Sequence, residues 1–215
     1  MAALTACGAS GEGGNKAVGG VPSASVKAPR SSLSMPVKDP LLAGSIPPDA
    51  QSLPEGWSVK AAPAPDACPA QMAPACRGQL FDVRAEYNTD AVDIVRVFVN
   101  TFATADEAAA AFAEDKKKIE TGGGAAEPRT AIALRVAGAD DSAGSTWQLL
   151  SQDGTTVINR WADSAVLAGN VVIKVDLAKS PEPPSIQLLT ALNTTLVSRA
   201  REAQSGNSPK SRLSL

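Results

Sequence analysis

The chain has 215 residues, a formal net charge of −2, 44% hydrophobic residues and only 4% aromatic residues. This length predicts one domain with unstructured ends, and its core must consist mainly of Val, Leu, Ile and Ala. The lysines at 116–118 are interpreted as a solvated helix end rather than a basic patch, so we expect no nucleic-acid partner. The chain contains no histidine, which excludes histidine bases and histidine-containing zinc sites; we therefore expect no enzyme, metal or cofactor.

The first motif is Leu4-Thr5-Ala6-Cys7, which resembles a bacterial lipobox. The resemblance implies that residues 1–7 are the remnant of a signal peptide and that Cys7 carries a lipid, with the membrane as partner. Only six residues precede Cys7, so we expect the true start codon to lie upstream of Met1. A chance occurrence of these four residues is the alternative.

Residues 8–38 are rich in Gly, Ser, Ala and Pro and show no hydrophobic period. A segment of this kind buries too little apolar surface to offset chain entropy, so we predict a disordered tether. Residues 39–203 are predicted to form the folded domain. Residues 204–215 are polar and are predicted to form a disordered tail.

The segment that organises the domain runs from residue 92 to residue 120. Alternating Val, Ile and Phe residues at 92–102 predict a central strand. Thr104 and Glu107 then have the spacing of a capping box, and apolar residues recur at helical spacing up to Ile119. The glycines at 122–124 end the predicted helix.

Further strands are predicted from period-two alternation and turn residues. The strand candidates are residues 58–60, 79–87, 92–102, 131–136, 146–151, 155–161 and 170–177. We expect an α+β domain with one antiparallel sheet of about five to six strands. Two amphipathic helices are expected to cover the sheet, the second of them at 185–203. Residues 138–144 are predicted to form a polar loop. Asp153-Gly154 is predicted to form a tight hairpin turn.

Cys68 and Cys76 are separated by seven residues in a Pro-rich loop. The spacing is not that of a zinc site, which takes four ligands. In an exported protein the two thiols are predicted to form a disulfide, stabilising the domain by roughly 2–3 kcal/mol. Two free structural thiols are the alternative.

Four motifs together resemble small cell-envelope lipoproteins of actinobacteria whose domain is like the extracellular sensor domain of mycobacterial receptor kinases. They are the lipobox-like tetrapeptide, the Leu53-Pro54-Glu55-Gly56-Trp57 turn, the step at 102–107, and the strand at 169–176 before a terminal helix. A Mog1/PsbP-like lipoprotein domain has the same order of elements and is the rival. The resemblance implies a sensory, ligand-binding or partner-binding module on the outer face of the cell membrane.

Three functions are compared for this domain. In a non-catalytic ligand-binding or sensing module, Trp57, Trp147 and Trp161 would line the site, because large amphipathic rings favour binding clefts; the alternative is that they are core residues. A structural or protein-docking lipoprotein would have no small ligand. A hydrolase, the least favoured, would use acidic residues expected in loops: Asp140, Asp141, Asp153 and Asp163.

Overall fold

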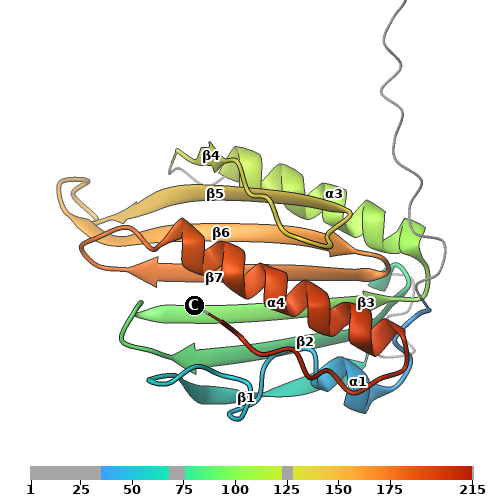
Figure 1. Cartoon of the computed structure of the whole chain (residues 1–215). Helices are drawn as coiled ribbons and strands as arrows, with labels where there is room; N and C mark the ends of the chain where they lie inside the picture. The colour runs from blue at the N-terminus through green and yellow to red at the C-terminus, as the bar shows by residue number, and fades with distance from the viewer. Residues whose placement is uncertain (1–34, 68–75, 123–127, 215) are drawn as a thin grey trace, which may run out of the picture.

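The computed structural model describes residues 35–67, 76–122 and 128–214. These residues form one antiparallel sheet of seven strands with three helices (Figure 1). The α+β class with an antiparallel sheet is confirmed, whereas the expected five to six strands and two helices were too few. The elements are α1 (Pro40–Gly44), β1 (Ser58–Ala67), β2 (Gln79–Asn88), β3 (Ile94–Phe102), α3 (Ala105–Thr121), β4 (Thr130–Ile132), β5 (Asp141–Leu150), β6 (Val157–Ala168), β7 (Val171–Lys179) and α4 (Ile186–Gln204).

The strand order across the sheet is β1-β2-β3-β7-β6-β5-β4. Two runs of hairpin-connected strands, β1 to β3 and β5 to β7, therefore meet where β3 pairs with β7. The predicted polar loop at 138–144 is partly wrong, because β5 already begins at Asp141, opposite Leu167 on β6. The strand predicted at 131–136 is shorter in the structure, where β4 pairs with β5 only over Thr130–Ile132.

The two long helices lie on opposite faces of the sheet, and the alternation of β7 shows which residues meet each helix. Val171, Ile173, Val175 and Leu177 belong to the larger core cluster, which contains α4. Val172 belongs to the second cluster, which contains Ala108, Phe112 and Ile119 of α3. Successive strand residues point to opposite faces, so even-numbered β7 side chains lie on the α3 face. Figure 1 shows α4 crossing the near face of the sheet, with α3 behind β4 and β5.

The start of α3 is fixed by the predicted capping box. The Thr104 hydroxyl accepts a hydrogen bond from the Glu107 amide at 3.2 Å, and the Glu107 carboxylate accepts from the Thr104 amide at 3.0 Å. The helix ends at Gly122, whose φ of 79° is a left-handed conformation that glycine adopts without steric strain. Within the described residues, no helix is long and apolar enough to cross a membrane.

The expectation of a disordered tail at 204–215 is wrong for the described residues of that segment. Leu213 is only 5% exposed, and its amide donates to the Ser52 carbonyl at 3.1 Å. The buried Arg199 of α4 also holds the tail, because its guanidinium donates to the carbonyls of Ser45, Ile46 and Ser211 at 2.7–2.8 Å. The prediction failed because it rested on the polar composition of the tail. It took no account of the burial of Leu213 or of the hydrogen bonds that Arg199 donates to backbone carbonyls.

Candidate functional site

A row of polar side chains crosses five strands on the α3 face of the sheet. Its members occupy directly paired positions on β2, β3, β7, β6 and β5. The row is Glu86, Arg96, Asp176, Asp163 and Ser145. Ala165 and Leu167, which α3 covers, lie two and four residues further along β6 on the same face. The polar row therefore lies beside the apolar patch under α3.

Asp163 and Asp176 are the centre of this row, paired across β6 and β7. Directly opposed side chains have Cβ atoms about 5 Å apart, so the two carboxyl groups are close neighbours. Asp163 is 7% exposed, and its Oδ2 accepts hydrogen bonds from Arg129 Nη1 and Trp147 Nε1, each at 2.6 Å. Its Oδ1 is buried and has no partner among the described residues. Burial raises the pKa of Asp163, while Arg129 and Trp147 oppose the shift.

Asp176 is the less constrained member of the pair. Burial and the charge of Asp163 raise its pKa to about 6, although Lys174, Arg96 and Arg129 favour the charged form. Among the described residues no ion pair involves Asp176, and its side chain lines a cleft. Near neutral pH it is therefore a largely ionised carboxylate with no direct countercharge.

Next to the polar row, Trp147 on β5 and Trp161 on β6 are paired across the strands and stack on one another. Their ring centroids are 5.2 Å apart and the rings are inclined by only 7°. The Arg129 guanidinium lies 5.0 Å from the Trp147 ring centroid, a distance at which cation–π attraction is effective. Trp161 Nε1 is buried and has no acceptor among the described residues.

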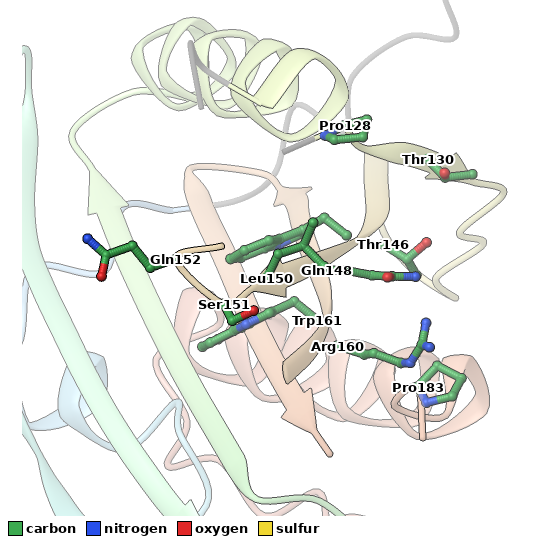
Figure 2. A pocket seen from close by; sticks show the side chains of 11 residues that line it. Pro128, Thr130, Thr146, Gln148, Leu150, Ser151, Gln152, Arg160, Trp161 and Pro183 are labelled. Carbon is green, nitrogen blue, oxygen red and sulfur yellow. The ribbon is translucent and has the colours of Figure 1, made fainter. Parts of the chain in front are cut away.

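Two hollows share this tryptophan pair. The first, of about 680 Å³, is lined by Trp147 and Trp161 together with Pro128, Thr130, Thr146, Gln148, Leu150, Ser151, Gln152, Arg160 and Pro183. Figure 2 shows Trp161 and Leu150 in its middle, with Arg160 and Pro183 at one end and Gln152 at the other. The second, of about 590 Å³, is a charged cleft between the end of α3 and the sheet, and it contains both Asp163 and Asp176.

The three candidate tryptophans do not form one site. Trp147 and Trp161 come together, but Trp57 lies elsewhere, with its ring 6.4 Å from that of Tyr87 and packed against the larger core cluster. The expectation that Asp163 lies in a loop is wrong, because it belongs to β6. The predicted strand ended at residue 161, whereas β6 continues to Ala168 and Arg129 and Trp147 satisfy the Asp163 carboxylate within it.

The three other acidic candidates have local roles. Asp140 pairs with Arg201 at 2.9 Å, and Asp141 pairs with Lys116 at 3.3 Å. The Asp153 carboxylate accepts from the Thr155 amide at 3.1 Å within the hairpin loop, and its hydrogen bonds to Ser151 and Thr155 lower its pKa to about 2. None of these three residues lines either hollow.

The predicted cysteine roles remain predictions. Cys7 and Cys68 lie outside the described residues, so neither the lipid anchor nor the pairing of Cys68 with Cys76 is tested by the described geometry. Cys76 itself lies just before β2 and lines a third hollow of about 330 Å³ beside α3.

Asp176 and Arg129 are the central members of the site that were not predicted from the sequence. The sequence does contain a pattern that points to Asp176, because this residue interrupts an apolar strand as Asp163 does. The two aspartates also lie at equal distances from the Gly169-Asn170 turn, so they face one another in the hairpin. Arg129 had no such signal, since it precedes a three-residue strand and reaches Asp163 only through the tertiary arrangement. In the described part of the chain, no group of three or more metal-ligating side chains is gathered.

No protein-family model and no curated protein matches the sequence. Among solved structures, the chain is similar to the extracellular domain of PknH from Mycobacterium tuberculosis. The two share 14% sequence identity with a TM-score of 0.42, and the match covers 71% of this chain and 87% of that one. A weak structural likeness to a mycobacterial extracellular domain is therefore present, and it assigns neither a ligand nor an anchor to this chain.

Proposed function

We propose that the chain is a non-catalytic module that binds a small molecule, with a ring of the ligand resting against Trp147 and Trp161. The observation that carries the proposal is the half-buried tryptophan stack at the wall of a hollow. Trp147 is held there by its hydrogen bond to Asp163 and by the Arg129 guanidinium. Rings fixed in this way offer a large contact surface and lose little conformational freedom on binding.

The size and lining of the first hollow fit a small ligand. About 680 Å³ lies within the usual range of roughly 300–1,000 Å³ for small-molecule pockets. The described lining residues combine tryptophan, leucine and proline with hydroxyl and amide groups, and they include one cation, Arg160, and no carboxylate. Arg160 is itself engaged, since its Nε donates to the Pro181 carbonyl at 2.8 Å. The part of a ligand that occupies this hollow should therefore be a largely neutral ring with a few polar substituents.

The contacts of the aspartate pair support a non-catalytic role. A general acid or base must exchange its proton with a bound substrate. The Asp163 Oδ2 atom already accepts from two donors, Arg129 and Trp147. Asp176 lines the cleft with a carboxylate that no described donor holds. One such carboxylate is better suited to binding a ligand than to a two-carboxylate mechanism.

The proposed place of action is the outer face of the cell membrane, with Cys7 as the lipid anchor and residues 8–38 as the tether. This part rests on the Leu4–Cys7 tetrapeptide and on the composition of the following segment. In the natural host, Cys7→Ala in the full-length gene, or globomycin, should move the protein from the membrane fraction to the soluble fraction. Unchanged partition would refute the anchor without affecting the binding site.

A thermal-shift screen with small ring compounds, 2-phenylethanol among them, tests the binding function. A ligand at ten times its Kd stabilises the folded state by about 1.4 kcal/mol, which raises the Tm by roughly 3–5 °C. Trp161→Val should abolish the shift, since it removes one ring and retains the Trp147–Asp163 hydrogen bond. Trp57→Phe is the matched control and should keep the shift. If no ring compound shifts the Tm, a protein-docking role without a small ligand becomes the better account.

A further inference from the structure

We propose that the charged cleft beside the tryptophan pair binds the positively charged nitrogen of an amine, with Asp176 as its countercharge and Asp163 as its neighbour. The inference rests on the proposed function and narrows it, because it makes the ligand a ring compound that carries an ammonium group. The ring would rest on Trp147 and Trp161, which line both hollows, and the nitrogen would enter the 590 Å³ cleft.

The first argument is the pairing of charges among the described residues of the cleft. Each of its four cations has a carboxylate within ion-pair distance, with Lys174 and Lys118 sharing Asp115. The pairs are Arg129–Asp163 at 2.6 Å, Arg96–Glu86 at 3.4 Å, Lys174–Asp115 at 3.5 Å and Lys118–Asp115 at 3.6 Å. Asp176 is the described ionisable group of the cleft that lacks such a partner, so it is the carboxylate available to a positively charged group of a ligand.

The second argument is a buried carboxylate oxygen, Asp163 Oδ1, which has no partner in the described part of the chain and belongs to a residue that lines the cleft. Asp163 is 93% buried, being 7% exposed, and its Oδ1 has no donor among the described residues. Buried acceptors are nearly always satisfied, so an orphaned carboxylate oxygen next to a cavity indicates a missing donor. An ammonium group on Asp176 supplies three donors in the immediate neighbourhood of Asp163.

The third argument is that the aromatic pair already accommodates a cation. The Arg129 guanidinium lies 5.0 Å from the Trp147 ring centroid, which is the geometry of a cation–π contact. Indole rings attract cations more strongly than other aromatic side chains do. Arg129 makes a cation–π contact with Trp147 and an ion pair with Asp163. A ligand ammonium group between the tryptophans and Asp176 would likewise combine a cation–π contact with an ion pair.

The protonation of Asp176 makes this binding dependent on pH. Its carboxyl group faces Asp163 on β6, Arg96 on β3 and Lys174 on its own strand, with Arg129, Asp115 and Lys118 around the same cleft. Burial and Asp163 raise the pKa of Asp176 to about 6. A proton and an ammonium group therefore compete for the same oxygen atoms, and the proton should prevail as the pH falls below about 6.

Calorimetry on the intact chain with three matched probes tests the inference. The probes are 2-phenylethylamine, 2-phenylethanol and 3-phenylpropanoate, which share a ring and differ in charge. At about pH 7.5 the amine should bind at least about tenfold more tightly than the alcohol, and the acid most weakly. Asp176→Asn should remove the advantage of the amine and leave the alcohol within about twofold, whereas Asp90→Asn, at an exposed turn position, should change neither.

A pH series on the unaltered chain provides a second readout that needs no variant. At about pH 5 roughly one tenth of Asp176 is ionised, so the advantage of the amine should fall by about tenfold. Equal binding of amine and alcohol at about pH 7.5, or tighter binding of the acid, would overturn the inference while leaving the ring site intact. If none of the three probes binds, the proposed function fails together with it.

Discussion

Asp163 on β6 and Asp176 on β7 lie directly opposite one another on the α3 face of the sheet. Like charges in this position repel, and burial adds to the penalty for ionising both. The pair persists because Asp163 is held by Arg129 and Trp147, while the unfavourable charge is concentrated on Asp176. A destabilised carboxylate beside a cleft is typical of a binding site rather than of a residue selected for stability.

The stability of the domain should report this penalty as a function of pH. The pKa of Asp176 is about 6 in the folded chain against an ordinary value of 3.8. Folding therefore favours the protonated form of Asp176. The stability that this gives the folded state is fully present below about pH 4 and is lost as the pH rises through about 6. At about pH 7.5, Asp176→Asn should raise the free energy of unfolding by on the order of 2 kcal/mol, so this variant should unfold at a higher urea concentration than the natural chain.

Urea unfolding of both chains between about pH 4 and pH 7.5 checks this prediction. The gap between them should widen with pH and close at the acidic end. Asp90→Asn should run parallel to the natural chain throughout, because an exposed carboxylate loses little solvation on folding. A gap that does not depend on pH would show that Asp176 titrates normally.

Arg199 of α4 should be among the largest single contributors to stability. It is 1% exposed and holds the Ser45, Ile46 and Ser211 carbonyls, so it connects the segment after α1 to the C-terminal tail. Arg199→Met fills the volume but leaves these acceptors unsatisfied, and it should lower the free energy of unfolding by about 3 kcal/mol. Arg135→Met, at an exposed position, should change it by less than about 0.5 kcal/mol. Equal effects of the two substitutions would show that the buried hydrogen bonds contribute little.

The predicted bridge between Cys68 and Cys76 can be checked by mass spectrometry under non-reducing conditions. The exported protein should give a peptide pair two hydrogens lighter than the reduced form, and reduction should lower the free energy of unfolding by roughly 2–3 kcal/mol. Two thiols that alkylate in the native protein would contradict the bridge. Cys7 should be absent from this pair because it is predicted to carry the lipid.

The sequence predicts the elements of this fold better than it predicts the site. Alternation located β2, β3 and β7, and the Thr104–Glu107 capping box located the start of α3, because these signals lie within one segment. The sequence did not predict that the C-terminal tail is packed on the domain. This packing depends on Arg199 and Ser52, which lie more than 140 residues apart in the sequence. Contacts of that range leave no local pattern.

The tryptophan pair shows how a small irregularity decides the site. A two-residue turn at Asp153-Gly154 would place Trp147 opposite Arg160. In the structure, Ser151 and Thr156 instead close a longer loop, and the register shifts at Ile158, between the Leu150–Val157 pair and the Leu149–Asn159 pair. This bulge brings Trp161 opposite Trp147. The sequence identified both rings as candidates but could not predict their stacking, because bulges follow from the packing of neighbouring strands.

The central claim is that a ring-bearing ligand contacts Trp147 and Trp161, and indole NMR measures this most directly. The chain has three tryptophans, so a ¹⁵N-labelled sample gives three indole N–H signals, assigned with the Trp57→Phe and Trp161→Val variants. On titration with 2-phenylethanol and 2-phenylethylamine, the signals of Trp147 and Trp161 should move while that of Trp57 stays in place. Three unmoved signals, or movement of Trp57 alone, would contradict the account.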